Sequence, residues 1–200
     1  MRILYVYTNG CAPAAEAVRK HAPGAIFIET PHIYDYNVIM AENWNSGEDL
    51  VVVEEDKVLH YGVIPSFNDC KHPWCVFAYT TFPQPYTRSI TIGLGCTKFS
   101  AEVQQEFGPE EFLVDDSPEW GVCPDCNGKG CWRYLDSRID KCLWKRGYSS
   151  HVHGWVEHLH KYPADWNETV GVTLEGYGEV DVTATIRKRS ASLVAPDLPN

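Results

Sequence analysis

Three consecutive acids end the most apolar segment of the sequence. Residues 49–56 read Asp-Leu-Val-Val-Val-Glu-Glu-Asp, so an aliphatic run leads directly into Glu54, Glu55 and Asp56. Carboxylates this close repel one another, and Mg²⁺ or Mn²⁺ held by one or two carboxylates and by substrate phosphates would offset the repulsion. In an extended chain Glu54 and Asp56 point to one side and Glu55 to the other, which makes Glu54 and Asp56 the predicted ligand pair. A solvated acidic turn is the alternative.

Histidines are concentrated near residues 151–160. His151 and His153 form one pair, His158 and His160 form another, and the members of each pair share a face if the chain is extended. Imidazoles ligate metal ions, act as general acids or bases, or bind phosphate. Aromatic and aliphatic residues between the two pairs indicate a partly buried strand that would hold these side chains in place.

The cysteines predict a second, structural metal site. Cys123 and Cys126 form a CxxC knuckle followed by glycines, and such a turn points two thiolates at one tetrahedral ion. We expect Cys131 and Cys142 to complete a Zn²⁺ site with them, with a nearby histidine as the alternative to Cys142. The glycines argue against a redox CxxC motif, because such motifs usually open a helix. We interpret Cys70, Cys75 and Cys96 as small, buried, hydrophobic side chains.

Alternating strands and helices in the first part of the chain would position these side chains. The predicted strands are 3–7, 25–29 and 49–56, and the predicted helices between them are 12–21 and 36–44. This order is the βαβ pattern, and an apolar run without alternation is typical of a buried parallel strand. Ligands of such sheets bind beyond the carboxyl ends of the strands. Thr8, Asn9 and the three acids should therefore share one rim of the sheet.

The later part of the chain adds further elements. Strands are predicted over 74–79 and 89–92, separated by a proline-rich loop at 82–85, and helices over 100–107 and 136–146. Ser100 is the expected N-cap of the first of these helices, and Asp136 of the second. Residues 170–186 alternate like a β-hairpin, and 188–200 are predicted to be a loose tail.

The composition excludes several classes of protein. With 44% hydrophobic and 12% aromatic residues, the chain has enough apolar material for a core, which excludes disorder throughout. A net charge of −10 argues against general affinity for nucleic acid. No apolar run approaches the roughly 20 residues of a membrane span, and residues 1–7 lack the features of a secretory signal. We therefore expect a cytoplasmic protein without membrane partners, whose cysteines are ligands, thiols or buried residues rather than disulfides.

Five segments follow one another in an order that is shared with a known family. They are Asp49–Asp56, Cys70–Tyr79, Leu94–Ser100, Leu135–Asp136 and His151–His160. The set resembles the small GT-A-type glycosyltransferase-like proteins of bacteriophages that infect actinobacteria, and the resemblance extends from about Leu4 to His160. It implies an abbreviated GT-A-like (Rossmann-like) α/β fold, with a mixed sheet flanked by helices, and a host cytoplasm as the location. The nucleotide-sugar-binding domain would span 1–162, including a cysteine-rich insertion at 119–142, and a C-terminal hairpin and tail would span 163–200.

The resemblance also implies an activity, namely metal-dependent transfer of a sugar from a nucleotide-diphosphate donor to an acceptor. Glu54 and Asp56 would form the acid-x-acid motif for Mn²⁺ or Mg²⁺, and His158 or His160 would add a ligand. In an inverting enzyme Asp136 would be the base that activates the acceptor hydroxyl, and a helix cap is its other interpretation. The residues expected to contact the nucleotide are Thr8, Asn9 and Glu55. The acceptor could be a protein, a glycan or a modified DNA base.

Two functions of other classes compete with this one. A catalytically degenerate GT-A-like scaffold stapled by zinc would act as a binding or interaction module. A zinc hydrolase would instead use the four late histidines, His151, His153, His158 and His160. Neither the H-E-x-x-H motif of metalloproteases nor the His-x-Glu pair of zinc deaminases is present.

Overall fold

The computed structural model describes residues 1–8, 11–30, 35–84, 87–91, 93–113 and 135–159. The chain divides into two units, Met1–His160 and Lys161–Asn200, and the second lies outside the described residues. The predicted hairpin at 170–186, the tail, the domain boundary at 162 and residues 119–134 of the predicted cysteine-rich insertion lie there or in the gap at 114–134, whereas residues 135–142 of that insertion are helical. These assignments stay predictions.

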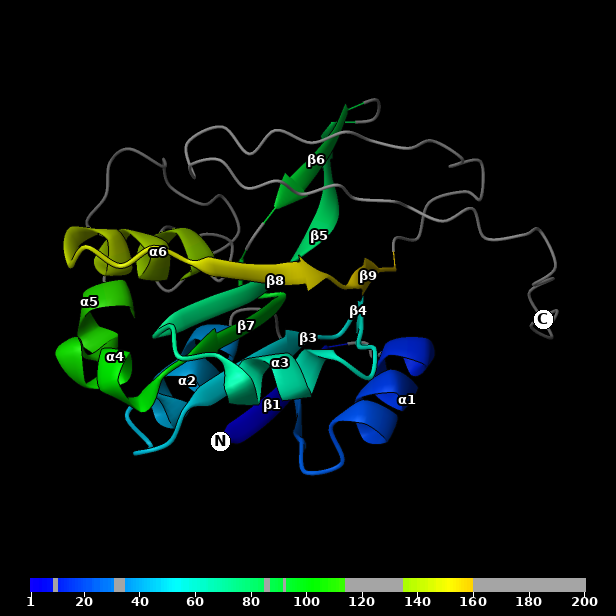
Figure 1. The fold of residues 1–200 in the computed structure, drawn as a ribbon, viewed down its shortest axis with the longest axis horizontal. Helices are drawn as coiled ribbons and strands as arrows, with labels where there is room; N and C mark the ends of the chain where they lie inside the picture. The colour runs from blue at the N-terminus through cyan, green and yellow to red at the C-terminus, as the bar shows by residue number, and fades with distance from the viewer. Residues whose placement is uncertain (9–10, 31–34, 85–86, 92, 114–134, 160–200) are drawn as a thin grey trace, which may run out of the picture. The chain divides into compact units, whose positions relative to one another are not determined.

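A mixed sheet of seven strands forms the centre of the described part of the first unit (Figure 1). The strands are β1 (Arg2–Tyr7), β2 (Ile26–Glu29), β3 (Leu50–Glu54), β5 (Trp74–Gln84), β6 (Thr87–Thr91), β7 (Cys96–Phe99) and β8 (His151–Trp155). Their order is β2-β1-β3-β7-β5-β6, with β8 also paired to β5. β1, β2 and β3 are parallel, β7 is antiparallel to both of its neighbours, and β8 is parallel to β5. A separate two-stranded sheet joins β4 (Lys57–Val58) to β9 (Glu157–His158).

Helices cover both faces of the sheet. They are α1 (Ala12–His21), α2 (Asp35–Asn43), α3 (Val63–Asp69), α4 (Ala101–Glu106), α5 (Pro109–Leu113) and α6 (Leu135–Lys145). Side chains of α2, α4, α5 and α6 share one hydrophobic cluster, and those of α1 and α3 share another. Alternate residues of β3 supply the two clusters, since Leu50 and Val52 belong to the first and Val51 and Val53 to the second. The result is a three-layer α/β/α arrangement of the described residues.

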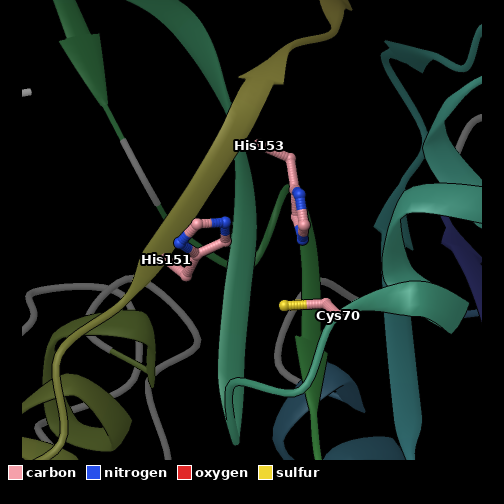
Figure 2. A group of neighbouring side chains, drawn as sticks. All are labelled: Cys70, His151 and His153. Carbon is pink, nitrogen blue, oxygen red and sulfur yellow. The ribbon is translucent and has the colours of Figure 1, made fainter. Parts of the chain in front are cut away.

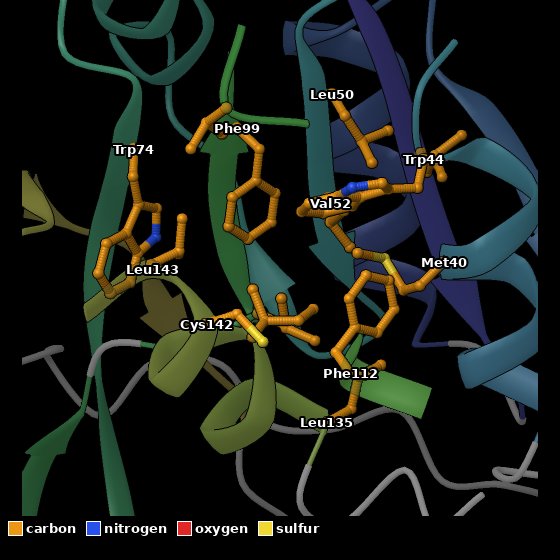
Figure 3. Close-up of a cluster of buried hydrophobic side chains, with 14 of the residues drawn as sticks. Met40, Trp44, Leu50, Val52, Trp74, Phe99, Phe112, Leu135, Cys142 and Leu143 are labelled. Atoms are coloured by element: carbon orange, nitrogen blue, oxygen red, sulfur yellow. The ribbon is translucent and has the colours of Figure 1, made fainter. Parts of the chain in front are cut away.

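The first cluster is held by close-packed aromatic rings (Figure 3). The Trp44 ring lies 5.1 Å from that of Phe99, 5.2 Å from that of Phe107 and 5.1 Å from that of Phe112. Its indole N–H is also satisfied, because Nε1 donates to the Phe107 carbonyl at 2.9 Å. Burying a side chain of this kind contributes roughly 1.5–3 kcal/mol, so β3 is firmly anchored on this face. That rigidity fixes the place where the three acids emerge.

Local sequence signals predicted most of these elements. The structure confirms strands at 3–7, 25–29 and 74–79 and a helix at 12–21, and the Ser100 hydroxyl accepts a hydrogen bond from the Val103 N–H at 3.2 Å as an N-cap should. The loop predicted at 82–85 is wrong in part, because β5 continues to Gln84. The register of β5 against β6 shifts between Thr81 and Gln84, and this irregularity accommodates Pro83, which has no N–H to donate. Asp136 lies one residue inside α6, which already includes Leu135, and its carboxylate accepts a hydrogen bond from the Ser137 N–H of the first turn at 2.8 Å.

No helix among the described residues combines the length and the apolar character that a membrane crossing requires.

Candidate functional site

A cavity of about 150 Å³ lies at the carboxyl ends of β1 and β3. The described residues that line it are Val6, Tyr7, Thr8, Thr30, Tyr36, Glu54, Glu55 and Asp56. The two strands are parallel and pair Val6 with Glu54, so the residues that come directly after the two strands meet at one edge of the sheet. The predicted rim is therefore confirmed for Thr8 and the acids, whereas Asn9 lies outside the described residues.

The chain turns at the acids instead of staying extended. β3 ends at Glu54, Glu55 and Asp56 form a turn, and the chain returns as β4. All three acids line the cavity, but their partners differ as expected of a ligand pair and a third acid that stands apart: Glu54 and Asp56 contact Lys57, whereas Glu55 contacts Thr8. The Glu55 carboxylate accepts a hydrogen bond from the Thr8 N–H at 2.9 Å, and the Glu55 carbonyl accepts one from the Tyr5 hydroxyl at 2.9 Å. These bonds tie the acidic turn to β1.

The side chain of Lys57 neutralises the acids from within the chain. Its Nζ lies 3.3 Å from Glu54 Oε2 and also forms an ion pair with Asp56 Oδ1. The lysine side chain is only 2% exposed, and its ammonium sits 4.3 Å from the centre of the Tyr79 ring. Sequence reasoning assigned the relief of carboxylate repulsion to a divalent ion, but the residue directly after the acids provides part of it. Glu54 and Asp56 do converge on one positive charge, as expected of a ligand pair.

His158 approaches the same acids through the β4–β9 pairing. Lys57 is the register partner of His158, and His158 Nε2 lies 2.7 Å from Asp56 Oδ2. The Leu159 N–H donates to the Asp56 carbonyl at 2.8 Å, which fixes the strand next to the turn. Burial opposes ionisation of Asp56, but the hydrogen bond to His158 and the Lys57 ammonium prevail and hold the pKa of this carboxyl well below 3.8. His158 thus lies beside the acids, where its role as a metal ligand stays a prediction, and His160 lies outside the described residues.

Asp136 supplies a third carboxylate near the other two. It lies in the first turn of α6, and a methyl group placed on Gly93 would meet both Asp136 Oδ2 at 3.0 Å and the Tyr79 hydroxyl at 2.9 Å. Burial raises the pKa of Asp136. Burial also raises the pKa of Glu54, opposed by the Lys57 ammonium and reinforced by the charges of Asp56 and Asp136. Glu54, Asp56 and Asp136 are therefore one electrostatically coupled group.

Sequence reasoning missed several polar side chains of this site. Thr30 follows β2 as Thr8 follows β1, and the two hydroxyls are 2.8 Å apart. The Tyr36 hydroxyl is buried, and no hydrogen-bond partner for it occurs among the described residues. Burial raises its pKa well above 10, so the phenol stays protonated and can donate. Thr30 had a usable signal in its place after a strand, whereas Tyr36 depends on how α2 packs.

The predicted zinc ligands are only partly described. Cys123, Cys126 and Cys131 lie outside the described residues. Cys142 lies on α6 in the hydrophobic core, where its thiol points at the Glu111 carbonyl with a separation of 3.8 Å. A zinc site that uses these four cysteines stays a prediction. Cys75 and Cys96 are buried, as expected, whereas Cys70 is only partly buried.

The acids provide donors that fit a hard divalent ion. Their oxygens converge on one cation, the Lys57 ammonium, and His158 offers an imidazole nitrogen beside them. Carboxylate oxygens are the preferred ligands of Mg²⁺ and Mn²⁺. A divalent ion at Glu54 and Asp56 would share or displace the contacts that Lys57 makes. His151 and His153 do not line this cavity and lie instead beside Cys70.

No protein-family model and no curated protein matches the chain. Among solved structures, it is similar to CMP:2-keto-3-deoxy-manno-octonic acid synthetase complexed with CTP, with 10% sequence identity and a TM-score of 0.38, over 78% of this chain and 91% of that chain. It is also similar to a Bacillus anthracis protein described as a glucose-1-phosphate thymidylyltransferase in complex with a sucrose, with 9% identity and a TM-score of 0.36, over 76% of this chain and 66% of that chain. Both likenesses are loose, so the site has to be interpreted from its own geometry.

Proposed function

We propose that the protein is a metal-dependent transferase that binds a nucleotide-sugar donor in the cavity beyond β1 and β3 and transfers the sugar to an acceptor hydroxyl. One observation carries this proposal. The carboxylates of Glu54 and Asp56 converge on the Lys57 ammonium at the edge of the cavity. His158 is hydrogen-bonded to Asp56. Two carboxylates and an imidazole at the carboxyl ends of parallel strands suit a divalent ion that binds a diphosphate. The resemblance to the phage GT-A-type proteins supports the same assignment.

The size of the cavity limits which part of the donor it holds. At about 150 Å³ it is smaller than the roughly 300–1,000 Å³ of pockets that enclose a whole drug-sized ligand. It therefore suits part of the donor, with the remainder lying along the surface. Of the three hydroxyl-bearing residues that line it, Thr8 and Thr30 bond to each other, whereas the Tyr36 hydroxyl has no partner among the described residues and can donate a hydrogen bond to a phosphate or ribose oxygen.

The ion and Lys57 would act on the leaving group. Glu54, Asp56 and His158 would hold Mn²⁺ or Mg²⁺, which offsets the negative charge that develops on the departing diphosphate. Lys57 keeps a second positive charge at the same edge and acts on the diphosphate as a point charge. Both effects stabilise charge in the transition state and need no movement of the sheet.

Asp136 is the proposed base. Its carboxylate accepts the proton of the acceptor hydroxyl, the acceptor oxygen bonds to the anomeric carbon of the sugar, and the bond from that carbon to the diphosphate oxygen breaks. The electron pair of the broken bond leaves with the diphosphate. A pKa raised by burial makes Asp136 a stronger base than an exposed carboxylate, and proton transfer is most efficient when the base has a pKa near the working pH.

A nucleotide-binding module without catalysis is the second candidate, and two contacts of Asp56 favour it. Both carboxylate oxygens of Asp56 already have partners, Lys57 at Oδ1 and His158 at Oδ2. A site neutralised in this way can bind an anionic nucleotide with no divalent ion. Turnover separates the two candidates, because only a transferase releases a nucleoside diphosphate.

The proposal is tested by calorimetric titration of the full chain with a panel of nucleotide sugars in the presence and absence of Mn²⁺. The double variant Glu54→Gln/Asp56→Asn should lower the metal-dependent affinity by about 100-fold, equivalent to roughly 2.8 kcal/mol. Glu42→Gln, on an exposed residue of α2, is the matched control and should bind like the unmodified chain. Chromatography of the reaction mixture detects the released nucleoside diphosphate. Binding that the double variant leaves unchanged would exclude the assignment, and binding without release of diphosphate would favour the module.

A further inference from the structure

A second group of metal-ligating side chains lies apart from the cavity. Cys70 directly follows α3, and His151 and His153 are on β8 (Figure 2). The thiol and the two imidazoles each offer one ligand atom, and these atoms all lie within 4.8 Å of one another. None of the three residues lines the cavity at the acids. This Cys–His cluster therefore needs an explanation of its own.

The fold brings the cluster together from distant parts of the chain. β8 runs parallel to β5 with His151 opposite Cys75, and the His151 and His153 rings lie side by side with their centroids 4.7 Å apart. Cys70 is held by both of its backbone groups. Its N–H donates to the Ser66 carbonyl at 3.1 Å, and its carbonyl accepts from Lys98 Nζ at 3.0 Å. The three ligand atoms are thus positioned by sheet pairing and by the end of α3.

The chemistry of the cluster suits Zn²⁺ better than Mg²⁺. Thiolate and imidazole are the ligands that zinc prefers, whereas Mg²⁺ requires oxygen donors. Ligand atoms about 2.0–2.3 Å from a tetrahedral zinc ion are roughly 3.5 Å from one another. Since the observed atoms are no more than 4.8 Å apart, small side-chain rotations are enough to close the group around an ion.

One imidazole nitrogen of the cluster is unsatisfied. His153 Nε2 is buried, and no hydrogen-bond partner for it occurs among the described residues. A buried polar atom without a partner costs about 1–3 kcal/mol, and coordination to a metal ion would remove that cost.

His72 lies next to the cluster but does not join it as a ligand. Its ring stacks on that of His151, with centroids 4.3 Å apart and planes only 5° from parallel. An ion bound to an imidazole lies in the plane of that ring. Two parallel stacked planes cannot both contain the same ion, so His72 orients His151, and the part of the chain that the structure describes offers three ligands.

We propose that Cys70, His151 and His153 form a zinc site with three protein ligands and with water in the fourth position of a tetrahedral ion. The ion would cross-link the connection between α3 and β5 to β8, two segments that lie some 80 residues apart in the chain. This site is additional to the divalent site proposed at the acids, and it does not depend on the transferase function.

The first test is the zinc content of the full chain and of four variants, measured by atomic absorption. Cys70→Ser and His153→Gln should each lower it by about one ion per chain, because each removes one of only three protein ligands. Cys11→Ser and His21→Gln, which change residues of the same types elsewhere, should leave it unchanged. Zinc at the predicted Cys123 site would be the same in all of these proteins, so the difference reports the Cys–His cluster alone. Equal zinc content in Cys70→Ser, His153→Gln and the unmodified chain would overturn the proposal.

The second test measures affinity by competition with a chelator. Partners outside the ligand shell change metal affinity by about 10- to 100-fold, so loss of Cys70 or His153 should weaken zinc binding by more than about 100-fold. His72→Ala removes only the stacking partner and should weaken it within that 10- to 100-fold range. A larger effect for His72→Ala than for Cys70→Ser would overturn the assignment of ligands.

The third test needs no substitution and so remains valid if a variant fails to fold. X-ray absorption at the zinc edge of the unmodified chain should show nitrogen as well as sulfur neighbours. A spectrum with sulfur neighbours alone, which a four-cysteine site would give, overturns the proposal, as does a chain purified without zinc that binds none when zinc is added.

Discussion

The carboxylate cluster of Glu54, Asp56 and Asp136 and the Cys–His cluster differ in how their ligand atoms are already engaged. Glu54 Oε2 and both oxygens of Asp56 contact Lys57 or His158. In the Cys–His cluster, the buried His153 Nε2 has no hydrogen-bond partner among the described residues. A metal ion entering the first cluster has to compete with an internal cation, whereas an ion entering the second satisfies an atom that lacks a partner.

This difference teaches that the types of ligand do not by themselves set metal affinity. The free energy of binding an ion to the acids includes the cost of weakening their ion pairs with Lys57, and buried charges that lose a partner are costly. The negative charge of a donor diphosphate can compensate for that cost. We therefore expect the acids to bind Mn²⁺ well only together with a nucleotide, and the Cys–His cluster to bind zinc without any substrate.

The largest expected effect concerns Asp136 and tests whether the carboxylate cluster alone carries the chemistry. Asp136→Asn removes the proposed base while keeping the size of the side chain, so turnover should fall by about 100- to 10,000-fold with little change in donor affinity. The measurement is release of nucleoside diphosphate together with calorimetry of donor binding. Zinc content should stay the same, because this residue lies outside the Cys–His cluster.

Asp140→Asn is the matched control for this prediction. Asp140 lies one turn further along α6, and the same change of charge there should leave turnover near that of the unmodified chain. Equal losses in both variants would mean that the charge of the helix matters and that Asp136 has no special role.

The next largest effect tests the internal cation directly. Lys57→Met leaves the carboxylates without their ammonium partner and should destabilise the metal-free protein by about 3 kcal/mol, the low end for removing one partner of a buried ion pair. Mn²⁺ should restore part of that stability and bind more tightly than to the unmodified chain, because its competitor is gone. Urea denaturation with and without Mn²⁺ measures both effects. If Mn²⁺ gives no recovery, the acids and Lys57 form a purely structural ion-pair network.

The elements of the fold were largely predictable because their signals are local. The aliphatic run at 50–53, the Ser100 cap and the glycine that follows α6 each act within one element. Gly147 has φ +82°, a conformation that suits glycine at the end of a helix. The proline-rich segment after Phe82 was harder, because a tertiary pairing with β6 overrides the preference of proline for a loop.

The functional groups were predictable only where they follow a strand directly. Thr8 and the acids were placed on one rim because parallel strands end at the same edge. Lys57 was missed although it follows Asp56. The sequence around the acids does not show that the long lysine side chain turns back toward the carboxylates of Glu54 and Asp56. The partners of His158 and of Cys70 depend on the β4–β9 and β5–β8 pairings, which join segments that are far apart in the chain.

Two glycines allow each cluster to be disturbed separately. A methyl group on Gly95 would lie 2.5 Å from both Lys57 Cε and the Tyr79 ring, so Gly95→Ala should cost about 1–3 kcal/mol and weaken donor binding. Gly154, next to His153, has φ +148°, and Gly154→Ala should cost about 1–2 kcal/mol from backbone strain and weaken zinc binding. Denaturation and the two binding assays measure these effects.

Gly24→Ala is the control for both glycine variants, because nothing lies within 4 Å of a methyl group at that position. Its stability should stay within about 0.5 kcal/mol of the unmodified chain. Each glycine variant should affect one ligand only. Loss of zinc in Gly95→Ala or of donor in Gly154→Ala would mean that the two clusters are coupled.

The smallest effect is a difference in the sign of pH dependence between Asp140, one helical turn from the proposed base, and His151 of the Cys–His cluster. Burial, reinforced by the charge of Asp136, raises the pKa of Asp140 from 3.8 to about 6, so the folded state holds this proton more tightly than the unfolded state. The stability that Asp140 contributes is present below pH 3.8 and is lost as the pH rises to about 6. Because Asp140 is partly exposed, the loss is about 1 kcal/mol.

The pH dependence of His151 has the opposite sign. Burial lowers the pKa of His151, so the stability that it contributes is present above pH 6.5 and is lost as the pH falls. In chelator-treated protein, Asp140→Asn should flatten the first slope and His151→Gln the second, measured by denaturation between pH 4 and 7. Slopes of the same sign at both residues would show that the two regions do not differ in this respect.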